Sequence, residues 1–307
     1  MTETNMSTDL QIIEYDRNLY PFESNWVNIN GNEVHFIDEG NGEVILFCHP
    51  PIASSFMYRN MIKILSKKFR CIALDFPGFG LSHPAANYDY SIRSQAQIIE
   101  ELIGYLSLDP MYLVMQEIGG HAAMLVFMKK PSLLKAVILT DTIIYPVSQY
   151  PKIWRMLNIV NSNLFNWVNS NFNLIINRLT SSGIKRRKMS QGEKETYKAM
   201  FNNHQIRRIS TKLLYQLVEE EELLSRIQQA FTTIFNRKPT LLVYGEFDSL
   251  TKLGIPNRIH KLLPNSEIHW IKGEEHFPHE GAPEEMSAII SNWIEKYSNV
   301  IQQHVEH

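Results

Sequence analysis

The chain has 307 residues, of which 44% are hydrophobic and 20% are charged, and its formal net charge is −2. This length and composition predict one large globular domain with an inserted lobe and exclude a disordered chain. The nearly balanced charge provides no field that would attract nucleic acid or an anionic membrane. We therefore expect an apolar small-molecule substrate in a pocket, and a monomer or weak homodimer.

The first twenty residues contain no basic segment followed by an apolar one, and no apolar run approaches the roughly 20 residues of a membrane-spanning helix. A cytoplasmic protein is expected. The two cysteines, Cys48 and Cys71, stand within apolar runs, which predicts buried thiols rather than a disulfide. The eleven histidines show no spacing suited to metal binding, so we expect neither a metal nor another cofactor.

Strand and helix patterns alternate along the chain. Short apolar runs that are typical of buried strands occupy residues 26–29, 33–38, 44–48, 71–74, 111–115, 136–140, 240–245 and 268–273. Helical spacing of apolar residues follows Ser91, a predicted N-cap, and recurs in residues 119–129 and from Met286 to Tyr297. This alternation predicts an α/β fold with a mostly parallel twisted sheet, helices on both faces, and ligands at the carboxyl ends of the strands.

The strand pattern stops between residues 146 and 237. This segment is rich in aromatic residues and asparagines with helical periodicity, and Ser190 with Glu193 forms a capping box. We predict that residues 146–237 form a helical cap, called the cap segment below, on a core of residues 1–145 and 238–307. The basic group 185–188 is interpreted as a solvated turn between cap helices.

The most informative motif is residues 114–120, VMQEIGG, where a buried strand runs into a helix through a turn with two glycines. Such a turn is typical of a nucleophile elbow, which holds one side chain above the sheet edge and aims backbone N–H groups at the reacting centre. Glu117 stands at its apex. The alternative is a glutamate that only stabilises the start of the next helix.

Other polar residues at strand ends occur in an order along the chain that indicates a class of enzyme. His49 and Asp75 follow two earlier strands, Asp248 follows residues 240–245, and His276 follows 268–273. The order nucleophile, acid, histidine is that of α/β-hydrolases. The motifs HPPIASSFMYRNM, DFPGFGLS, QEIGG, GEFDSL and HFPHEGAPEE together resemble haloalkane dehalogenases and their epoxide-hydrolase relatives, from about Asn18 through nearly the whole chain.

The resemblance implies that Glu117 occupies the place of a nucleophilic aspartate, and that His276 is the base that activates water. The spacing from His276 to Glu280 also matches the family. Asp248 is favoured over Asp141 as the acid that orients His276, and the other aspartate is expected to bond a backbone amide or to serve the pocket. His49, His121 and His279 are interpreted as structural or exposed.

Three positions depart from the family. Pro51 and Ile118 stand where dehalogenases carry the asparagine and tryptophan that hold the departing halide, and neither has a side-chain N–H. Proline also removes one backbone donor of the oxyanion hole. Glu117 is one methylene longer than aspartate, which shifts its carboxylate by roughly 1 Å. These departures argue against haloalkane dehalogenation.

Residues expected around the oxyanion site and the pocket are Ile118, Pro51, His49, Tyr145 and Trp154. Aromatic residues in and next to the cap segment are expected to favour an apolar ligand. They are Tyr145, Tyr150, Trp154, Phe165, Trp167, Phe172 and Tyr197. The family's epoxide hydrolases protonate the epoxide oxygen with cap tyrosines, which makes Tyr145, Tyr150 and Tyr197 candidates for that role.

Three functions remain open from the sequence. The first is an enzyme in which Glu117 and His276 carry out acid–base or unusual covalent chemistry on an apolar molecule, such as elimination, cyclisation or decarboxylation. The second is a conventional hydrolase of epoxides, esters or halides with Glu117 as its nucleophile. The third is a small-molecule binding protein without catalysis, which the presence of both His276 and Asp248 disfavours.

Overall fold

The computed structural model describes residues 15–305. The first 14 residues lie outside the described residues. They carry part of the expectation that no basic segment is followed by an apolar one at the start of the chain. Within residues 15–305, no helix combines the length and the apolar character that crossing a membrane requires. Cys48 and Cys71 are free and buried, as predicted.

In the described part of the chain, eight strands form one sheet in the order β1-β2-β4-β3-β5-β6-β7-β8. Strands β1 and β2 are antiparallel to their neighbours, whereas β3 to β8 run parallel. The strands are β1 (Asn25–Ile29), β2 (Asn32–Glu39), β3 (Val44–Cys48), β4 (Arg70–Leu74), β5 (Met111–Met115), β6 (Leu134–Thr140), β7 (Thr240–Gly245) and β8 (Glu267–Ile271). Each predicted strand is present, and the mostly parallel sheet is confirmed.

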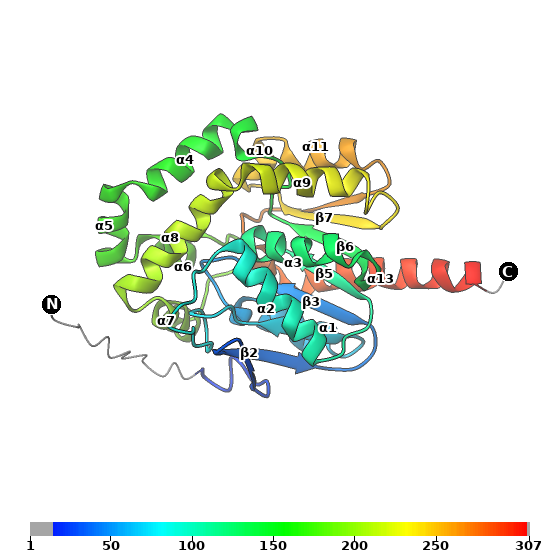
Figure 1. Cartoon of the computed structure of the whole chain (residues 1–307), viewed down its shortest axis with the longest axis horizontal. Helices are drawn as coiled ribbons and strands as arrows, with labels where there is room; N and C mark the ends of the chain where they lie inside the picture. Colours follow the sequence, from blue (N-terminus) through cyan, green and yellow to red (C-terminus); the bar gives the residue numbers. More distant parts are fainter. Residues whose placement is uncertain (1–14, 306–307) are drawn as a thin grey trace.

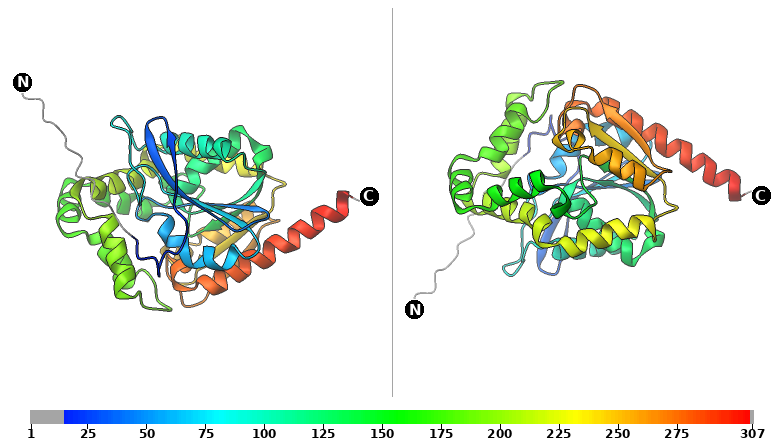
Figure 2. Two further views of the ribbon diagram at one scale, coloured as in Figure 1. Left: turned by 90° about the horizontal axis from the view of Figure 1, so that it is seen from below. Right: turned by 90° about the horizontal axis from the view of Figure 1, so that it is seen from above.

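Helices cover both faces of the sheet, which explains why its central strands are apolar throughout. One face carries α2 (Ile92–Tyr105) and α3 (Glu117–Lys129), and the other carries α1 (Arg59–Leu65) and α13 (Pro283–Val305) (Figures 1 and 2). The helix α11 (Ile255–Leu262) lies beside β7 and β8. Ser91 accepts a hydrogen bond from the backbone of Ser94 at the start of α2, which confirms the predicted N-cap.

The cap segment contains six helices and, among the described residues, no strand. They are α4 (Pro151–Asn161), α5 (Asn163–Phe172), α6 (Leu174–Ser182), α7 (Gln191–Met200), α8 (His204–Glu219) and α9 (Glu221–Thr232). Helices α4 to α7 lie at one end of the molecule, on the left of Figure 1, and α8 runs from there toward α3. Helix α9 instead packs against α3 beside the sheet, because Leu223, Ile227 and Phe231 form a buried apolar stripe. Because α9 contacts α3, we propose a cap of α4 to α8 rather than of the whole segment 146–237.

The interpretation of residues 185–188 as a solvated turn is wrong for Arg187. Its guanidinium donates to Glu193 at 2.8 Å and to Glu280 at 2.7 Å. Arg59 of α1, which is 1% exposed, forms ion pairs with the same two glutamates, and Tyr197 donates to Glu280 at 2.6 Å. This buried network joins α1 and the short helix α12 (Pro278–Gly281) to α7, whose predicted capping box is confirmed.

Candidate active site

Glu117 lies at a tight turn between β5 and α3. Its φ of +44° is in the left-handed region, which a residue with a side chain adopts only under strain. Two glycines allow the turn: a Cβ on Gly119 would lie 2.2 Å from the carbonyl oxygen of His49, and one on Gly120 would lie 2.1 Å from the side chain of Met115. The backbone N–H of Glu117 donates to Oγ1 of Thr142 at 3.0 Å. The geometry is therefore that of the predicted strand–elbow–helix motif.

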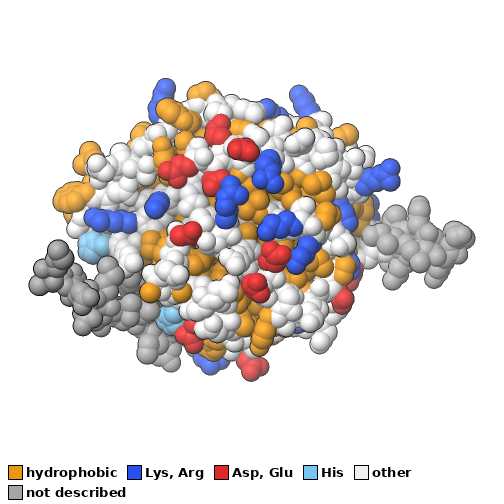
Figure 3. Space-filling model, viewed as in Figure 1, with side chains coloured by type: hydrophobic (Ala, Val, Ile, Leu, Met, Phe, Trp, Pro, Cys, Tyr) orange, Lys and Arg blue, Asp and Glu red, His pale blue; other side chains and the backbone are white. Residues whose placement is uncertain are grey.

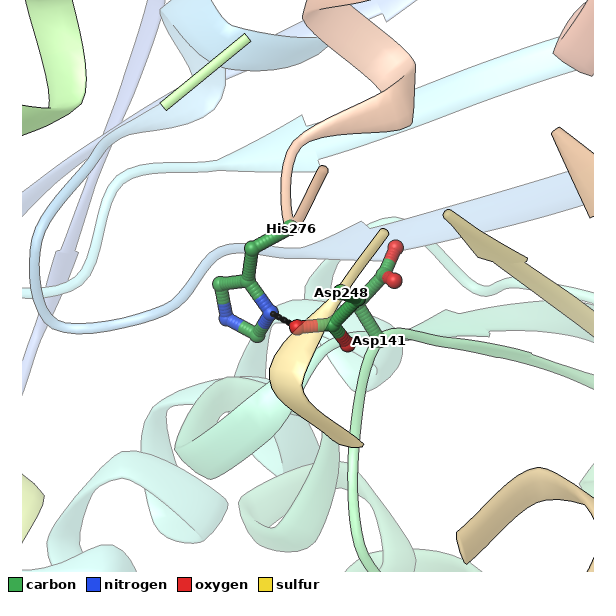
Figure 4. A group of neighbouring side chains, drawn as sticks. All are labelled: Asp141, Asp248 and His276. Atoms are coloured by element: carbon green, nitrogen blue, oxygen red, sulfur yellow. Dashed lines mark hydrogen bonds and ion pairs between the residues drawn. The ribbon is translucent and has the colours of Figure 1, made fainter. Parts of the chain in front are cut away.

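His276 joins two carboxylates that come from distant parts of the chain. Its Nε2 lies 3.0 Å from Oε1 of Glu117. Its Nδ1 lies 3.1 Å from Oδ1 of Asp248, the contact drawn in Figure 4. Asp248 follows β7 and His276 follows β8, so the three groups meet at the carboxyl ends of the strands. Asp248, rather than Asp141, is the hydrogen-bond partner of the histidine.

The charges of the two carboxylates determine the protonation of His276. Burial lowers the pKa of its imidazole, but the charge of Asp248 and the hydrogen bonds to Asp248 and Glu117 outweigh burial and raise the pKa well above its usual value. Burial likewise raises the pKa of Asp248, but His276 outweighs it and the pKa is lowered. The hydrogen bonds to Asp248 and Glu117 thus favour the protonated form of the His276 imidazole.

Asp141 stands next to this pair, on the Nδ1 side of the His276 ring (Figure 4). It accepts a hydrogen bond from the backbone N–H of Gly245 at 3.0 Å, and its own φ is +38°. Its Oδ2 is buried and has no hydrogen-bond donor among the described residues. Burial, and then the negative charge of Asp248, raise the pKa of Asp141 well above its usual value. Asp141 therefore keeps its proton to a higher pH than a free aspartate does.

Within the described residues, Asp141, Asp248 and His276 also form a group of potential metal ligands. One ligand atom from each residue lies within 4.8 Å of the other two. Two of these donor groups are already engaged with each other, because Nδ1 of His276 and Oδ1 of Asp248 share a hydrogen bond. A metal ion would have to break that bond, so the arrangement fits an acid–histidine pair better than a metal site.

A cavity of about 540 Å³ opens onto Glu117 and His276. Its walls are mainly apolar, and Ile52 and Ile143 of the core contribute to them. The cap segment supplies further apolar side chains, including those of Ile153, Leu157, Val160, Phe165, Ile175 and Leu179. Such a cavity suits a mostly apolar ligand of small-molecule size.

None of the five residues expected around the oxyanion site and the pocket is in the lining of this cavity, which corrects the prediction for Tyr145 and Trp154. The Tyr145 hydroxyl donates to the backbone oxygen of Arg258, whose guanidinium also lies 4.0 Å from the Tyr145 ring centre. Trp154 is 46% exposed on α4, because the neighbouring Ile153 and Leu157 are the residues that turn inward.

The other aromatic residues of the lid region divide in the same way. Phe165 lines the cavity, whereas Trp167 and Phe172 are exposed. Tyr150 accepts from Arg258, and Tyr197 belongs to the Arg59 network. None of the three candidate tyrosines is in the cavity wall.

Pro51 and Ile118 are buried beside the elbow and, as the sequence requires, offer no side-chain N–H. His49 is structural, since its Nδ1 donates to the oxygen of Pro50 at 2.8 Å and its Nε2 accepts from the backbone of Phe76 at 3.0 Å. His279 is buried, and its ring nitrogens have no hydrogen-bond partner among the described residues. His121 was expected to be structural or exposed, but it lines the cavity and bonds the oxygen of Ile143.

Sequence reasoning missed Thr142 and, apart from Phe165, the apolar cap residues of the cavity. Thr142 follows β6, so the rule that ligands gather at strand ends could have identified it. The inward faces of α4 and α6 carry no comparable signal, because an apolar stripe is the same whether it meets a core or a cavity.

A family model described as the alpha/beta hydrolase fold matches residues 43–283. The chain belongs to this family. Haloalkane dehalogenase 2 of Mycobacterium tuberculosis is 31% identical over 277 residues, which cover 90% of this chain and 96% of that protein. The match places the chain in the haloalkane dehalogenase-like branch, as the resemblance implied, and it is an α/β-hydrolase-fold enzyme.

Two further similarities extend over most of the chain. The cis-3-alkyl-4-alkyloxetan-2-one decarboxylase of Shewanella oneidensis is 26% identical over 295 residues, which cover 93% of this chain and 92% of that protein. A crystal structure of a putative ancestral haloalkane dehalogenase superposes with a TM-score of 0.80 at 22% identity, covering 90% of this chain and 99% of that one. The structural likeness establishes the fold.

Proposed function

We propose that this enzyme uses Glu117 together with His276 on an apolar small molecule whose leaving group stays within the molecule, as in the decarboxylation of a strained lactone ring. The observation that carries the proposal is the hydrogen bonding of His276 to both Asp248 and Glu117, beside positions 51 and 118 that lack halide donors. Displacement of a free halide depends on N–H donors aimed at the developing charge. Ring opening that leaves a carboxylate within the substrate does not require these N–H donors.

An oxetan-2-one ring can be opened and decarboxylated without water. Oε2 of Glu117, which has no hydrogen-bond donor among the described residues, attacks the ring carbon bonded to oxygen. The ring C–O bond breaks, and its electron pair leaves as a carboxylate. The bond from the neighbouring carbon to that carboxylate then breaks, its electrons form the C=C bond, and Glu117 departs as a carboxylate beside CO₂ and an alkene. The imidazolium at Oε1 stabilises this departing charge.

The relatives and the cavity support this substrate class. The name of the Shewanella relative specifies an oxetan-2-one with two alkyl groups, and the apolar cavity of about 540 Å³ can accept such chains. We expect alkene and CO₂ from cis-3,4-dialkyloxetan-2-ones, measured by gas chromatography, and loss of both with Glu117→Gln and with His276→Ala. Undiminished turnover by both variants would refute the proposed roles.

The second candidate is hydrolysis of an epoxide or ester through a covalent Glu117 intermediate. One feature favours it: forming the ester removes the Glu117 charge that helps to hold the His276 proton, so the imidazole can then act as a base toward water. This route predicts a stable glutamyl ester in His276→Ala. Peptide mass spectrometry would detect the mass increase on Glu117, and a consumed substrate without this adduct would exclude the route.

A further inference from the structure

The net charge of −2 conceals a strong local asymmetry in the cap. From residue 142 to residue 192 the sequence contains seven lysines and arginines and no aspartate or glutamate. Arg186 and Arg187 are paired with glutamates from elsewhere in the chain. Lys152, Arg155 and Arg178 are exposed, and no ion pair with any of them is found among the described residues.

The same region exposes unusually large apolar side chains. Of the eleven exposed large hydrophobic residues among those described, seven lie on α4, α5 or the start of α6. Leu164 is 74% exposed, Trp167 is 57% exposed and Phe172 is 59% exposed, and the rings of Trp167 and Phe172 contact each other edge to face. Hydrophobic side chains gather at the left edge of Figure 3, where α5 lies in Figure 1. Exposed apolar side chains that are grouped in this way usually mark a surface that binds another protein or a membrane.

The cations and the apolar residues share helix faces. On α4, Lys152, Arg155, Met156 and Ile159 follow the spacing of one exposed stripe. On α6, Leu174 and Arg178 lie four positions apart, on one face of the helix, and both are exposed. We call these six residues, with Leu164, Trp167 and Phe172, the cap patch. Exposed tryptophan, phenylalanine and leucine next to lysine and arginine are typical of surfaces that bind at the membrane interface.

We propose that the cap patch docks the enzyme onto an anionic phospholipid bilayer. The cations interact with the lipid headgroups, and the apolar side chains of α4 and α5 enter the interface. A second copy of the chain fits the patch less well, because a symmetric dimer would place the same unpaired cations against one another.

Docking would bring the cavity to the bilayer. Met156 belongs to the patch and also lines the cavity, and so does Arg178. Val160, Phe165 and Ile175 of the same three helices form its apolar wall. An alkyl-chain substrate could therefore pass from the lipid phase into the cavity; this last step rests on the proposed function, whereas docking itself does not.

Flotation of the full chain with vesicles tests the docking without any substrate. We expect the chain to bind vesicles that contain phosphatidylglycerol. Binding to vesicles of phosphatidylcholine alone should be much weaker, and added salt should weaken binding.

Trp167→Ala should reduce binding at least about fivefold, whereas Trp26→Ala, which removes a comparably exposed tryptophan from β1, should not. Lys152→Gln with Arg155→Gln should reduce binding more than about tenfold, since each cation is worth about fivefold, whereas Lys67→Gln with Arg237→Gln should leave it unchanged.

Three results would overturn the proposal. The first is absence of binding to anionic vesicles, or equal binding by the patch variants and their controls. The second is a dimer in sedimentation equilibrium that Trp167→Ala converts to a monomer, because the occupant would then be a second copy. The third is equal binding to phosphatidylcholine and phosphatidylglycerol vesicles, because the cations of the patch would then have no role. Circular dichroism of each variant ensures that a loss of binding is not a loss of fold.

Discussion

At the scale of single residues, the length of Glu117 sets its contact with His276. Its carboxylate reaches Nε2 at 3.0 Å from a backbone that is itself fixed by the elbow. Aspartate at this position would withdraw the carboxylate by roughly 1 Å, and misplacement on that scale costs about 10²-fold in rate.

We therefore expect Glu117→Asp to lower kcat by about 10²-fold on the natural substrate, without starting halide release from bromoalkanes, because Pro51 and Ile118 still lack the donors. Product formation and a halide electrode measure the two effects. Glu117→Gln, which keeps the length but not the charge, is the matched control and should be less active than Glu117→Asp. Undiminished turnover by Glu117→Asp would show that the extra methylene has no role.

Asp141 supplies a prediction about the dependence of stability on pH. Its pKa is raised in the folded chain, whereas an unfolded aspartate titrates near about 3.9. Above that pH the folded state holds a proton that the unfolded state has lost, so stability decreases by about 1.4 kcal/mol per pH unit until the folded pKa is reached. Asp141→Asn removes this decrease while its side-chain oxygen can still accept from Gly245.

We expect Asp141→Asn to be more stable than the parent at pH 7 and to lose that advantage near pH 4. Urea unfolding across this range measures the difference. The exposed Asp109→Asn is the control and should follow the parent. A variant that is less stable than the parent at pH 7 would contradict the raised pKa of Asp141.

The residues of the site could be predicted to different degrees. Glu117, Asp248 and His276 each follow a recognisable strand, so their meeting at one sheet edge was predictable. The sequence favoured Asp248 over Asp141 but could not decide between them, because the two follow adjacent strands and only the loop after β7 brings Oδ1 of Asp248 to the histidine. Tyr145 and Trp154 were misplaced because aromatic composition does not specify which way a side chain points.

At the scale of elements, one buried network connects the core to the cap helix α7. Arg59 is enclosed by Glu193 and Glu280, and removing one partner of such a pair leaves uncompensated charge. We expect Arg59→Met to lower the free energy of unfolding by about 3–5 kcal/mol. Lys68→Ala, which breaks the exposed pair with Glu295, should cost less than about 1 kcal/mol. Urea unfolding compares the two, and equal small losses would show that the network adds little.

The strands and most helix starts were predictable because their signals are local. Continuous apolar runs specify buried strands, and Ser91 and Ser190 cap the helices that they precede. The position of α9 and the burial of Arg187 depend on contacts with α3 and with Glu280, which are distant in the sequence. Local patterns carry no information about such partners.

At the scale of the whole molecule, the α/β-hydrolase fold fixes where the site lies but not which reaction occurs there. The same elbow, acid and histidine can serve water-dependent hydrolysis or a water-free elimination. The chemical distinction lies in whether an oxygen atom from solvent enters the product.

Turnover of a cis-3,4-dialkyloxetan-2-one in H₂¹⁸O therefore tests the central claim most directly. The decarboxylation route transfers no solvent oxygen, so we predict an alkene and CO₂ in equal amounts and no hydroxy acid that contains ¹⁸O. CO₂ must be trapped as it forms, because it exchanges oxygen with water after release. A ¹⁸O-labelled hydroxy acid as the main product would contradict the account and identify the enzyme as a hydrolase.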